Sequence, residues 1–424
     1  MLAVGQQDIY LTTNPQISFF RTVYRRHSPF ALESLSQTLN GTCDFGRKVT
    51  STMSRNGDLL ASGYVNVQLP ALTAATGTTI AWTRHLGEAL IKEMNVTIGG
   101  ATIDTWISHM VHVWAELTIP EDKRAGYRRL IGDIEELTDQ NTAIPAAELN
   151  IPLPFFFTQS WGQALPIVSL MFHEVIITLQ FATFNELVIT GNGVPISNPP
   201  SLVNVDLLMT YVYLDGVERK VFSQSSHEYL VQLFQYTGAE SVSVPNPKLK
   251  LTFAHPAKEL IWAVVPNINV DNYANRTFDY TDSGSSSNYY NGNDPIITAR
   301  ILLNTTERIS ERSSAFFSVL SPFWHHTRCP AKGIGIYSFA LNPEALQPSG
   351  SCNFSRLENV SLNLTLSTGT AAVTIYVFAR VYNILRIVSG MGGLAYASSG
   401  DVASGEGVKK FLDLSAFDNA VAVC

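Results

Sequence analysis

Charged residues are scarce in this chain: they make up 15% of its 424 residues, against 46% hydrophobic residues. Acidic side chains number 35 and basic ones 28, which gives a net charge of −7. Two modest basic clusters, residues 21–27 and 123–129, are interpreted as solvated or ion-paired, with a lipid or protein surface as the alternative. Proteins that coat nucleic acid usually carry a basic patch or arm, so we expect no direct contact with nucleic acid. So few charges favour a protein that hides part of its exterior against neighbours.

Cysteine and long apolar runs are also scarce. The four cysteines, Cys43, Cys329, Cys352 and Cys424, are too few and too scattered for a disulfide framework or a zinc module. One bridge between Cys329 and Cys352 is conceivable, but we expect reduced thiols in a cytosolic assembly. No stretch reaches the roughly 18 apolar residues that a membrane span requires. The first residues also lack the basic and apolar regions of a signal peptide, so we expect a soluble protein made inside the cell.

Patterns that carry catalysis are sparse as well. His109, His112 and Glu116 would share one face of a helix and could bind a metal, but two histidines and a distal carboxylate form a weak set. The pair His325-His326 has only one cysteine near it, so we interpret both groups as ordinary structural residues. The sequence contains no nucleophile elbow, phosphate loop or zinc-protease motif. We therefore predict no enzyme and assign no catalytic residue, cofactor or metal.

Alternation of apolar and polar residues with a period of two is the dominant pattern. It runs through residues 175–181 and 360–366, and through 373–382, where the opposite face carries Tyr376 and Phe378. Aromatic residues on this opposite, outer face indicate that a second sheet or a partner covers it as well. Helical pattern is confined to residues 105–117 and 125–137. Short strands without alternating helices indicate a β-sandwich or barrel.

The pattern of predicted strands occurs twice along the chain, in the same order. The offset between matching blocks shrinks from 205 (98 to 303) through 185 (175 to 360) to 168 (205 to 373), because the second copy has shorter connections. The blocks are 96–100 with 300–305, 172–179 with 357–364, and 205–223 with 373–389. This repetition predicts two similar β domains that join near residues 220–228.

A polar loop of unusual length lies between Pro266 and Pro295. Connections are usually about 4–6 residues long, so a loop of this size is expected on an exposed functional surface. Among the sequons of the chain, we selected Asn275 as the candidate for glycosylation, because most others lie in or beside strands. After residue 398 the chain becomes rich in glycine and serine and then forms a small amphipathic segment, 408–414.

Motifs in order along almost all of residues 7–397 resemble one known family, the major capsid proteins of the nucleocytoplasmic large DNA viruses. The resemblance is closest to phycodnaviruses, with iridoviruses next. The motifs occupy residues 7–12, 14–26, 54–59, 164–175, 213–215, 227–230 and 347–356, and end in Tyr382-Asn383-Ile384-Leu385-Arg386 and Ser389-Gly390-Met391-Gly392-Gly393-Leu394-Ala395-Tyr396. Residues 397–424 extend beyond the point where the family's chains end, so the resemblance assigns them no role.

The resemblance implies an all-β fold of two consecutive eight-stranded jelly rolls with minor helical insertions. It divides the chain into an inner-face arm (1–26), a first jelly roll (27–219), a second (220–397) and a tail (398–424). Homotrimers would act as pseudo-hexameric capsomers that tile an icosahedral virion shell around a membrane-enclosed DNA genome. Synthesis and assembly would take place in the host cytoplasm.

Contacts are also implied by the resemblance, with neighbouring capsomers, minor capsid proteins and the inner membrane surface. The residues expected in inner-face contacts are Asp8, Tyr10, Asn14, Phe19, Phe20, Arg21, Arg25 and Arg26. Those expected in an outer loop are Asn275, Tyr280, Tyr289 and Tyr290.

Two other functions compete with a capsid role. A cupin-type enzyme would need His-x-His and Glu ligands on inward strand positions, and neither copy has them. A secreted lectin or glycosidase would need an export signal, which is absent, and for hydrolysis a pair of carboxylates about 5–9.5 Å apart, which the sequence does not identify.

Overall fold

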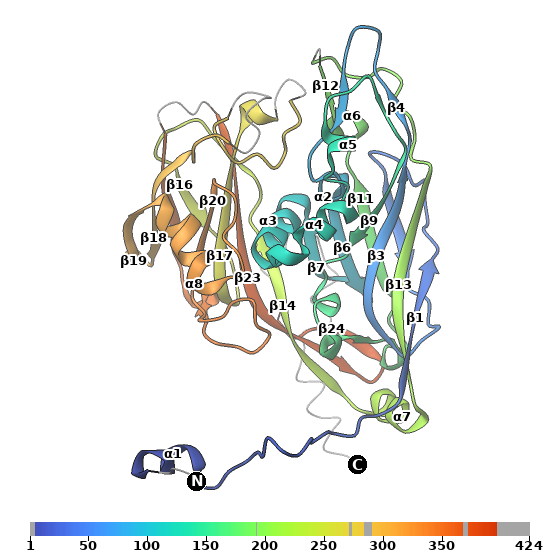
Figure 1. Ribbon diagram of the computed structural model, residues 1–424, viewed down its shortest axis with the longest axis vertical. Helices are drawn as coiled ribbons and strands as arrows, with labels where there is room; N and C mark the ends of the chain where they lie inside the picture. Colours follow the sequence, from blue (N-terminus) through green and yellow to red (C-terminus); the bar gives the residue numbers. More distant parts are fainter. Residues whose placement is uncertain (1–4, 192, 271–273, 284–290, 368–371, 397–424) are drawn as a thin grey trace.

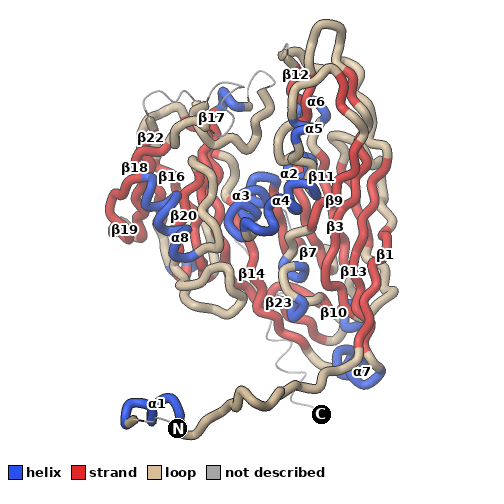
Figure 2. The backbone as a smooth tube through the Cα atoms, in the orientation of Figure 1, coloured by secondary structure: helices blue, strands red, loops and turns tan. Residues whose placement is uncertain are grey.

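The computed structural model describes residues 5–191, 193–270, 274–283, 291–367 and 372–396. Two β-sandwiches stand side by side, and an extended N-terminal arm leaves the body at one end (Figure 1). Strands make up most of both sandwiches, with helices gathered between them and on their rims (Figure 2). In the described part of the chain, no helix is both long and apolar enough to cross a membrane. The predicted tail and its segment 408–414 lie outside the described residues.

The first sandwich packs two antiparallel sheets face to face. One has the order β1 (Phe30–Gln37), β13 (Asn204–Leu214), β3 (Leu59–Leu69), β10 (Leu165–Pro166), with β9 (Ala147–Pro152) also paired to β3. The other has the order β2 (Lys48–Thr52), β11 (Val175–Phe181), β6 (Ile91–Ile98), β7 (Ala101–Ile107). Two small ribbons pair β12 (Val188–Thr190) with β5 (Ile80–Trp82) and β4 (Leu72–Thr73) with β8 (Ala143–Ile144).

The second sandwich repeats this plan. One sheet has the order β14 (His227–Tyr236), β23 (Val373–Val388), β17 (Pro256–Pro266), β20 (Ile334–Ser338). Short strands extend it: β15 (Glu240–Val242) and β24 (Met391–Leu394) pair with β23, and β21 (Cys352–Asn353) pairs with β17. The other sheet has the order β16 (Lys248–Leu251), β22 (Val360–Leu366), β18 (Ile296–Leu303), β19 (Thr306–Ser313).

Helices occupy the connections. Those of the first half are α2 (Leu86–Leu90), α3 (Ser108–Thr118), α4 (Glu121–Leu130), α5 (Glu135–Thr138), α6 (Phe184–Leu187) and the single turns η2 (Phe156–Thr158), η3 (Trp161–Gln163) and η4 (Ile167–Ser169). Those of the second half are η5 (Asn267–Asn269), the π-helix η8 (Phe316–Leu320), α8 (Ser321–His325) and η9 (Phe354–Arg356). The arm holds η1 (Gln6–Asp8) and α1 (Ile9–Thr12), and α7 (Gly216–Gln224) connects the halves.

The repeated strand order confirms the doubling that the sequence predicts. The three pairs of similar blocks fall on β6 and β18, on β11 and β22, and on β13 and β23, and each pair holds the same position in its sheet. Each half is thus a sandwich of two sheets of four main strands with the jelly-roll order, and the fold is a double jelly roll. Helix α7, between β13 and β14, begins where the Asp215 carboxylate accepts a hydrogen bond from the backbone N–H of Glu218 at 2.8 Å.

Side-chain alternation explains which faces are buried. In β22, Val360, Leu362 and Leu364 are at most 4% exposed, and the equivalent residues of β11 behave alike. Most of the buried apolar residues of the two jelly rolls belong to one continuous cluster, beside a small second one around Leu59 and Val212. The two halves therefore share an apolar boundary rather than meeting across water.

The two predicted helices are present, with different bounds. The first begins at Ser108 rather than at 105, because residues 101–107 pair with β6 as strand β7. The second is broken into α4 and α5. Gly132 between them has φ +76°, a conformation that favours glycine, and a Cβ there would lie 2.5 Å from the Leu149 side chain.

Candidate functional site

The boundary between the two jelly rolls, which we call the seam, is formed by α3 and β7 of the first against β14 and β23 of the second. The His109 and Tyr376 rings are 4.1 Å apart, and the Trp106 and Phe234 rings are 4.7 Å apart. Both faces of β23 are therefore covered, as its aromatic pattern predicts. The cover on its outer face is the first jelly roll of the same chain.

Arg380 is the charged centre of the seam and is only 1% exposed. Its guanidinium donates hydrogen bonds to the Pro343 carbonyl at 3.1 Å, to Gln232 Oε1 at 2.5 Å and to Gln159 Oε1 at 3.3 Å. Burial lowers the pKa of Arg380 to about 10, so the group stays charged at neutral pH. Its Nη1 lies 3.8 Å from Glu259 Oε1, which supplies the balancing charge.

His326 forms the other half of this buried charge network. Its Nε2 lies 2.9 Å from Glu259 Oε2 and its Nδ1 lies 3.0 Å from Glu344 Oε1, and the side chain is fully buried. Burial disfavours the charged ring, but Glu259 and then Glu344 outweigh it and raise the pKa of His326 to about 9. The neighbouring His325 is bound differently, since its Nδ1 lies 2.9 Å from the Leu341 carbonyl oxygen.

The structure does not contain the disulfide between Cys329 and Cys352 that was considered as an alternative to reduced thiols. Cys329 and Cys352 are both free thiols in the structure, as is Cys43. Burial raises the pKa of the Cys352 thiol, which keeps it in the unreactive protonated form.

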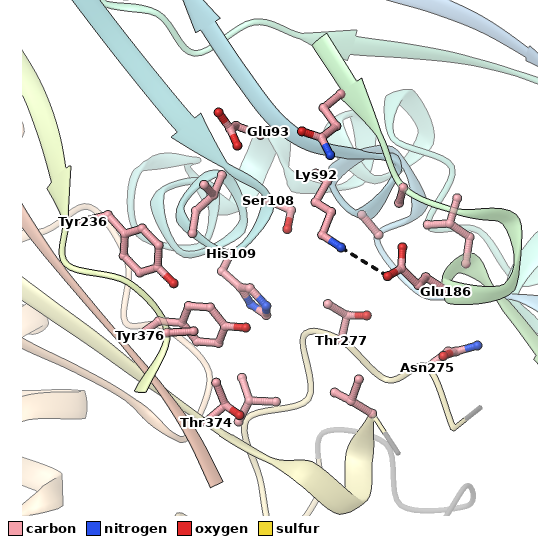
Figure 3. A pocket seen from close by; sticks show the side chains of 18 of the residues that line it. Lys92, Glu93, Ser108, His109, Glu186, Tyr236, Asn275, Thr277, Thr374 and Tyr376 are labelled. Carbon is pink, nitrogen blue, oxygen red and sulfur yellow. Dashed lines mark hydrogen bonds and ion pairs between the residues drawn. The ribbon is translucent and has the colours of Figure 1, made fainter. Parts of the chain in front are cut away.

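A cavity of about 500 Å³ opens beside the seam (Figure 3). Lys92 and Glu186 face each other across one wall at 3.2 Å, while His109 and Tyr376 line the opposite wall. Burial, and then the neighbouring His112, lower the pKa of His109 to about 3, so its ring is neutral. Its Nδ1 forms a hydrogen bond of 3.2 Å with the Tyr280 hydroxyl. This wall of the cavity therefore presents a neutral imidazole whose Nδ1 is bonded to a tyrosine hydroxyl.

His109, His112 and Glu116 lie on one helix, as predicted, but each side chain contacts a different partner. Glu116 pairs with Arg328 and lies 3.7 Å from Arg124. Within the described residues, His112 is the one of the three that belongs to a group with metal-ligand chemistry, and its companions are residues that the sequence analysis missed.

Those residues are His85 and Glu88. The His112 Nδ1 lies 2.6 Å from Glu88 Oε2, and His85 Nδ1 lies 3.8 Å from the same oxygen. His85 and Glu88 lie at the start of α2, 27 and 24 residues before His112, so no local spacing could reveal the group.

The arm residues expected in inner-face contacts are accessible. Tyr10 is 96%, Phe19 89% and Phe20 99% exposed. Asn14, Arg21, Arg25 and Arg26 are exposed, and Asp8 is half-buried because its carboxylate accepts a hydrogen bond from the Gly5 N–H. Large apolar side chains that are exposed to solvent indicate a binding surface. The partner that binds to the arm is still a prediction.

Two of the residues expected in the outer loop, Asn275 and Tyr280, are buried, although other described residues of the segment, such as Ile268 at 57% exposed, are accessible. Asn275 is 6% exposed, and its Nδ2, where a glycan would be attached, donates to the Asn185 carbonyl at 2.7 Å and the Val188 carbonyl at 2.6 Å. Tyr280 is fully buried at the seam. The segment is polar because its amides and hydroxyls make internal hydrogen bonds. Tyr289 and Tyr290 lie outside the described residues.

Comparison with known proteins agrees with this architecture. The family described as "Large eukaryotic DNA virus major capsid protein" matches residues 218–393, and "Major capsid protein N-terminus" matches residues 18–215. The chain is 39% identical to the major capsid protein of Pyramimonas orientalis virus, over 94% of this chain and 98% of that protein. It is 36% identical to that of Phaeocystis pouchetii virus, over 94% of this chain and 99% of that one.

Solved structures show the same fold. The crystal structure of VP54 of PBCV-1 matches with a TM-score of 0.78 and 30% identity, over 90% of this chain and 100% of that chain. The Faustovirus major capsid protein matches with a TM-score of 0.76 at 13% identity, over 91% and 94% of the two chains. The fold and the seam define a double jelly-roll capsid protein. The chain belongs to the family of major capsid proteins of large eukaryotic DNA viruses, and it is a virion capsid component.

Proposed function

We propose that this chain forms homotrimers that act as pseudo-hexameric capsomers, and that these capsomers tile an icosahedral shell around a membrane-enclosed DNA genome. One observation carries the proposal: the two jelly rolls repeat the same strand order, and each side of the seam has an equivalent, solvent-exposed surface in the described part of the chain.

The side of the seam that the first jelly roll provides is helix α3, and its equivalent in the second jelly roll is the surface of η8 and α8. Helix α3 follows β7, and the equivalent connection after β19 holds η8 and α8. Whereas α3 is packed against the second jelly roll, α8 leaves Phe323 72% exposed and Trp324 60% exposed. Val319 on η8 adds to this surface at 55% exposed.

The side of the seam that the second jelly roll provides is strand β14 with β23, and its equivalent in the first jelly roll is β1 with β13. Strand β1 holds the position in its sheet that β14 holds in the other. Phe234 of β14 is 8% exposed because the first jelly roll covers it, but Phe30 and Leu32 of β1 are 59% and 47% exposed. The α8 surface and β1 lie on opposite sides of the molecule (Figure 1).

Placing α8 of one chain against β1 and β13 of the next repeats the seam between chains. This contact is head-to-tail, and such contacts generate a closed ring when the rotation closes. Three chains with two similar domains each then form a ring with three seams within chains and three between them. The sixfold outline would let identical capsomers tile a hexagonal lattice by weaker edge contacts.

The arm and the charge balance support the remaining parts of the proposal. The exposed apolar residues of the arm suit minor capsid proteins or the inner membrane surface, and the net charge of −7 disfavours direct contact with DNA. The function is structural rather than enzymatic, and synthesis and assembly are placed in the host cytoplasm. A cupin-type site is not favoured, since the His85–His112 group lies on helices rather than on inward strand positions.

Size-exclusion chromatography with light scattering tests the proposal on the purified full chain. A stable species of three times 46.5 kDa is expected. A persistent monomer at concentrations above those reached in an infected cell would contradict it and favour a monomeric β-sandwich function.

A further inference from the structure

Three side chains with metal-ligand chemistry meet where α2 abuts α3. They are His85, Glu88 and His112, all buried, and one ligand atom from each lies within 4.8 Å of the other two. The carboxylate is central, since Glu88 Oε2 lies 2.6 Å from His112 Nδ1 and 3.8 Å from His85 Nδ1.

These distances are close to those of an occupied site. Zinc binds imidazole nitrogen and carboxylate oxygen at about 2.0–2.2 Å, which places neighbouring ligand atoms about 3.3 Å apart in a tetrahedron. The separations from Glu88 Oε2, 2.6 and 3.8 Å, bracket that value, so shifts of less than about 1 Å would bring this oxygen to ligand spacing from both histidines. Two histidines and one glutamate are also a donor set that zinc sites use.

Supporting groups hold two of the three candidate ligands. The Tyr127 hydroxyl donates to Glu88 Oε1 at 2.6 Å and leaves Oε2 turned toward the histidines. On the other side, Asp133 Oδ2 lies 3.8 Å from His85 Nε2, and Arg128 anchors Asp133 at 2.7 Å. A hydroxyl on the glutamate and a carboxylate behind the histidine are the outer partners that orient ligands in metal sites.

The candidate ligand atom of His112 is Nδ1, which faces Glu88 Oε2 at 2.6 Å from a side chain that is 1% exposed. Phe278 stacks on this imidazole with 4.4 Å between the ring centroids, and this packing holds the ring in the orientation that turns Nδ1 toward Glu88. The other ring nitrogen, Nε2, has no hydrogen-bond partner in the described part of the chain and is not a candidate ligand atom.

The group can also be reached from outside. A cavity of about 300 Å³ is lined by His85 and His112 together with Glu116 and Asp133. Three arginines also line it. Arg84 and Arg128 lie 3.1 and 2.7 Å from Asp133, and Arg124 lies 3.7 Å from Glu116, so carboxylates offset part of their positive charge.

We propose that His85, Glu88 and His112 bind one divalent transition-metal ion with the ligand preference of zinc. The ion would join the start of α2 to the middle of α3, and so brace the helix that forms one side of the seam. The inference does not depend on the trimer, because every ligand comes from one jelly roll of one chain.

Calorimetric titration of the metal-stripped full chain with zinc chloride tests the site. We expect one ion per chain, and a tetrahedral visible spectrum when cobalt replaces zinc. Glu88→Gln should abolish this binding while the far-ultraviolet circular dichroism stays unchanged. Tyr127→Phe, which removes only an outer partner, should weaken zinc affinity about 10- to 100-fold.

The matched control is His109→Asn, one turn away on the same helix and outside the ligand group. It should retain one ion and the cobalt spectrum. Absence of stoichiometric zinc binding to the folded wild type would overturn the proposal. So would equal loss in H109N and E88Q, or binding that survives in E88Q, because the ion would then be held elsewhere. The oligomeric state from light scattering is read independently, so failure of the trimer would be distinguished from failure of the metal site.

Discussion

The guanidinium carbon of Arg380 lies 3.9 Å from the centre of the Trp114 ring, so a buried cation of the second jelly roll stacks on an indole of the first. Trp114 lies on α3 and Arg380 on β23. The contact joins the two halves of the seam, and it places the charge network of Glu259 and His326 directly behind it.

Replacing Arg380 with methionine should destabilise the chain by about 3–5 kcal/mol, because it leaves Glu259 buried with one cation fewer. The measurement is the unfolding midpoint in guanidinium chloride, followed by tryptophan fluorescence. Arg386→Met is the matched control, since Arg386 pairs with Glu228 at 2.8 Å on an exposed part of the sheet. That variant should lose less than about 1 kcal/mol. Equal losses in both variants would show that burial of Arg380 has no special role.

The His326–Glu259 pair should make stability depend on pH. The pKa of His326 is raised to about 9 in the fold, against about 6.5 in an unfolded chain. Its contribution is therefore fully present below about pH 6.5 and is lost as the pH rises through 9. Lys258, whose pKa burial lowers to about 7, acts in the opposite direction.

Comparison with His326→Gln separates the two groups, because that variant retains Lys258. The difference in unfolding free energy between wild type and H326Q should shrink steadily from pH 6.5 to 9.5. A difference that is constant across this interval would show that His326 is not charged in the fold.

Close backbone packing inside the second jelly roll gives a steric prediction. A Cβ at Gly335 on β20 would lie 2.4 Å from the Trp262 ring, which is 1% exposed on the adjacent β17. Gly335→Ala should therefore cost about 1–3 kcal/mol by overpacking. Gly393→Ala is the control, because a Cβ there meets nothing within 4 Å, and it should change stability by less than about 0.5 kcal/mol. Thermal unfolding of both variants provides the comparison.

The exposed surface of α8 should carry the contact between chains. The double variant F323D/W324D is expected to run as a folded monomer in light scattering, because burying two carboxylates in an apolar contact is costly. Trp161→Asp places the same change at a tryptophan that is 63% exposed on the first jelly roll, and it should leave the trimer intact. A trimer that survives in F323D/W324D would move the contact to another surface.

The arm should not contribute to the stability of the body. Deletion of residues 1–26 should leave the melting temperature and the trimer unchanged, since Tyr10 and Phe20 are 96% and 99% exposed. Co-sedimentation with purified minor capsid proteins or with vesicles should be lost. Retained co-sedimentation would assign these contacts to other surfaces.

Much of the fold could be predicted from sequence because its signals are local. Alternation along β11, β22 and β23 depends only on the period of a strand, and the repeated order of similar blocks predicts two equivalent sandwiches. The division of one predicted helix into α4 and α5 depends on the backbone of Gly132 and its contact with Leu149, which is distant in sequence.

The sites could not be predicted in the same way. His85 and Glu88 approach His112 only because α2 packs on α3, and the histidine face that local spacing indicated has three separate sets of partners. Asn275 looked accessible because its segment is polar. In the fold its side-chain amide donates hydrogen bonds to two backbone carbonyls. The polar side chain therefore serves internal hydrogen bonds rather than contact with water.

An electron cryomicroscopy reconstruction of the purified oligomer tests the central claim most directly. We predict a threefold ring in which α8 of each chain covers β1 and β13 of the next, as α3 covers β14 and β23 within the chain, with Phe323 and Trp324 buried. A ring in which α8 faces solvent and β1 remains uncovered would contradict the account.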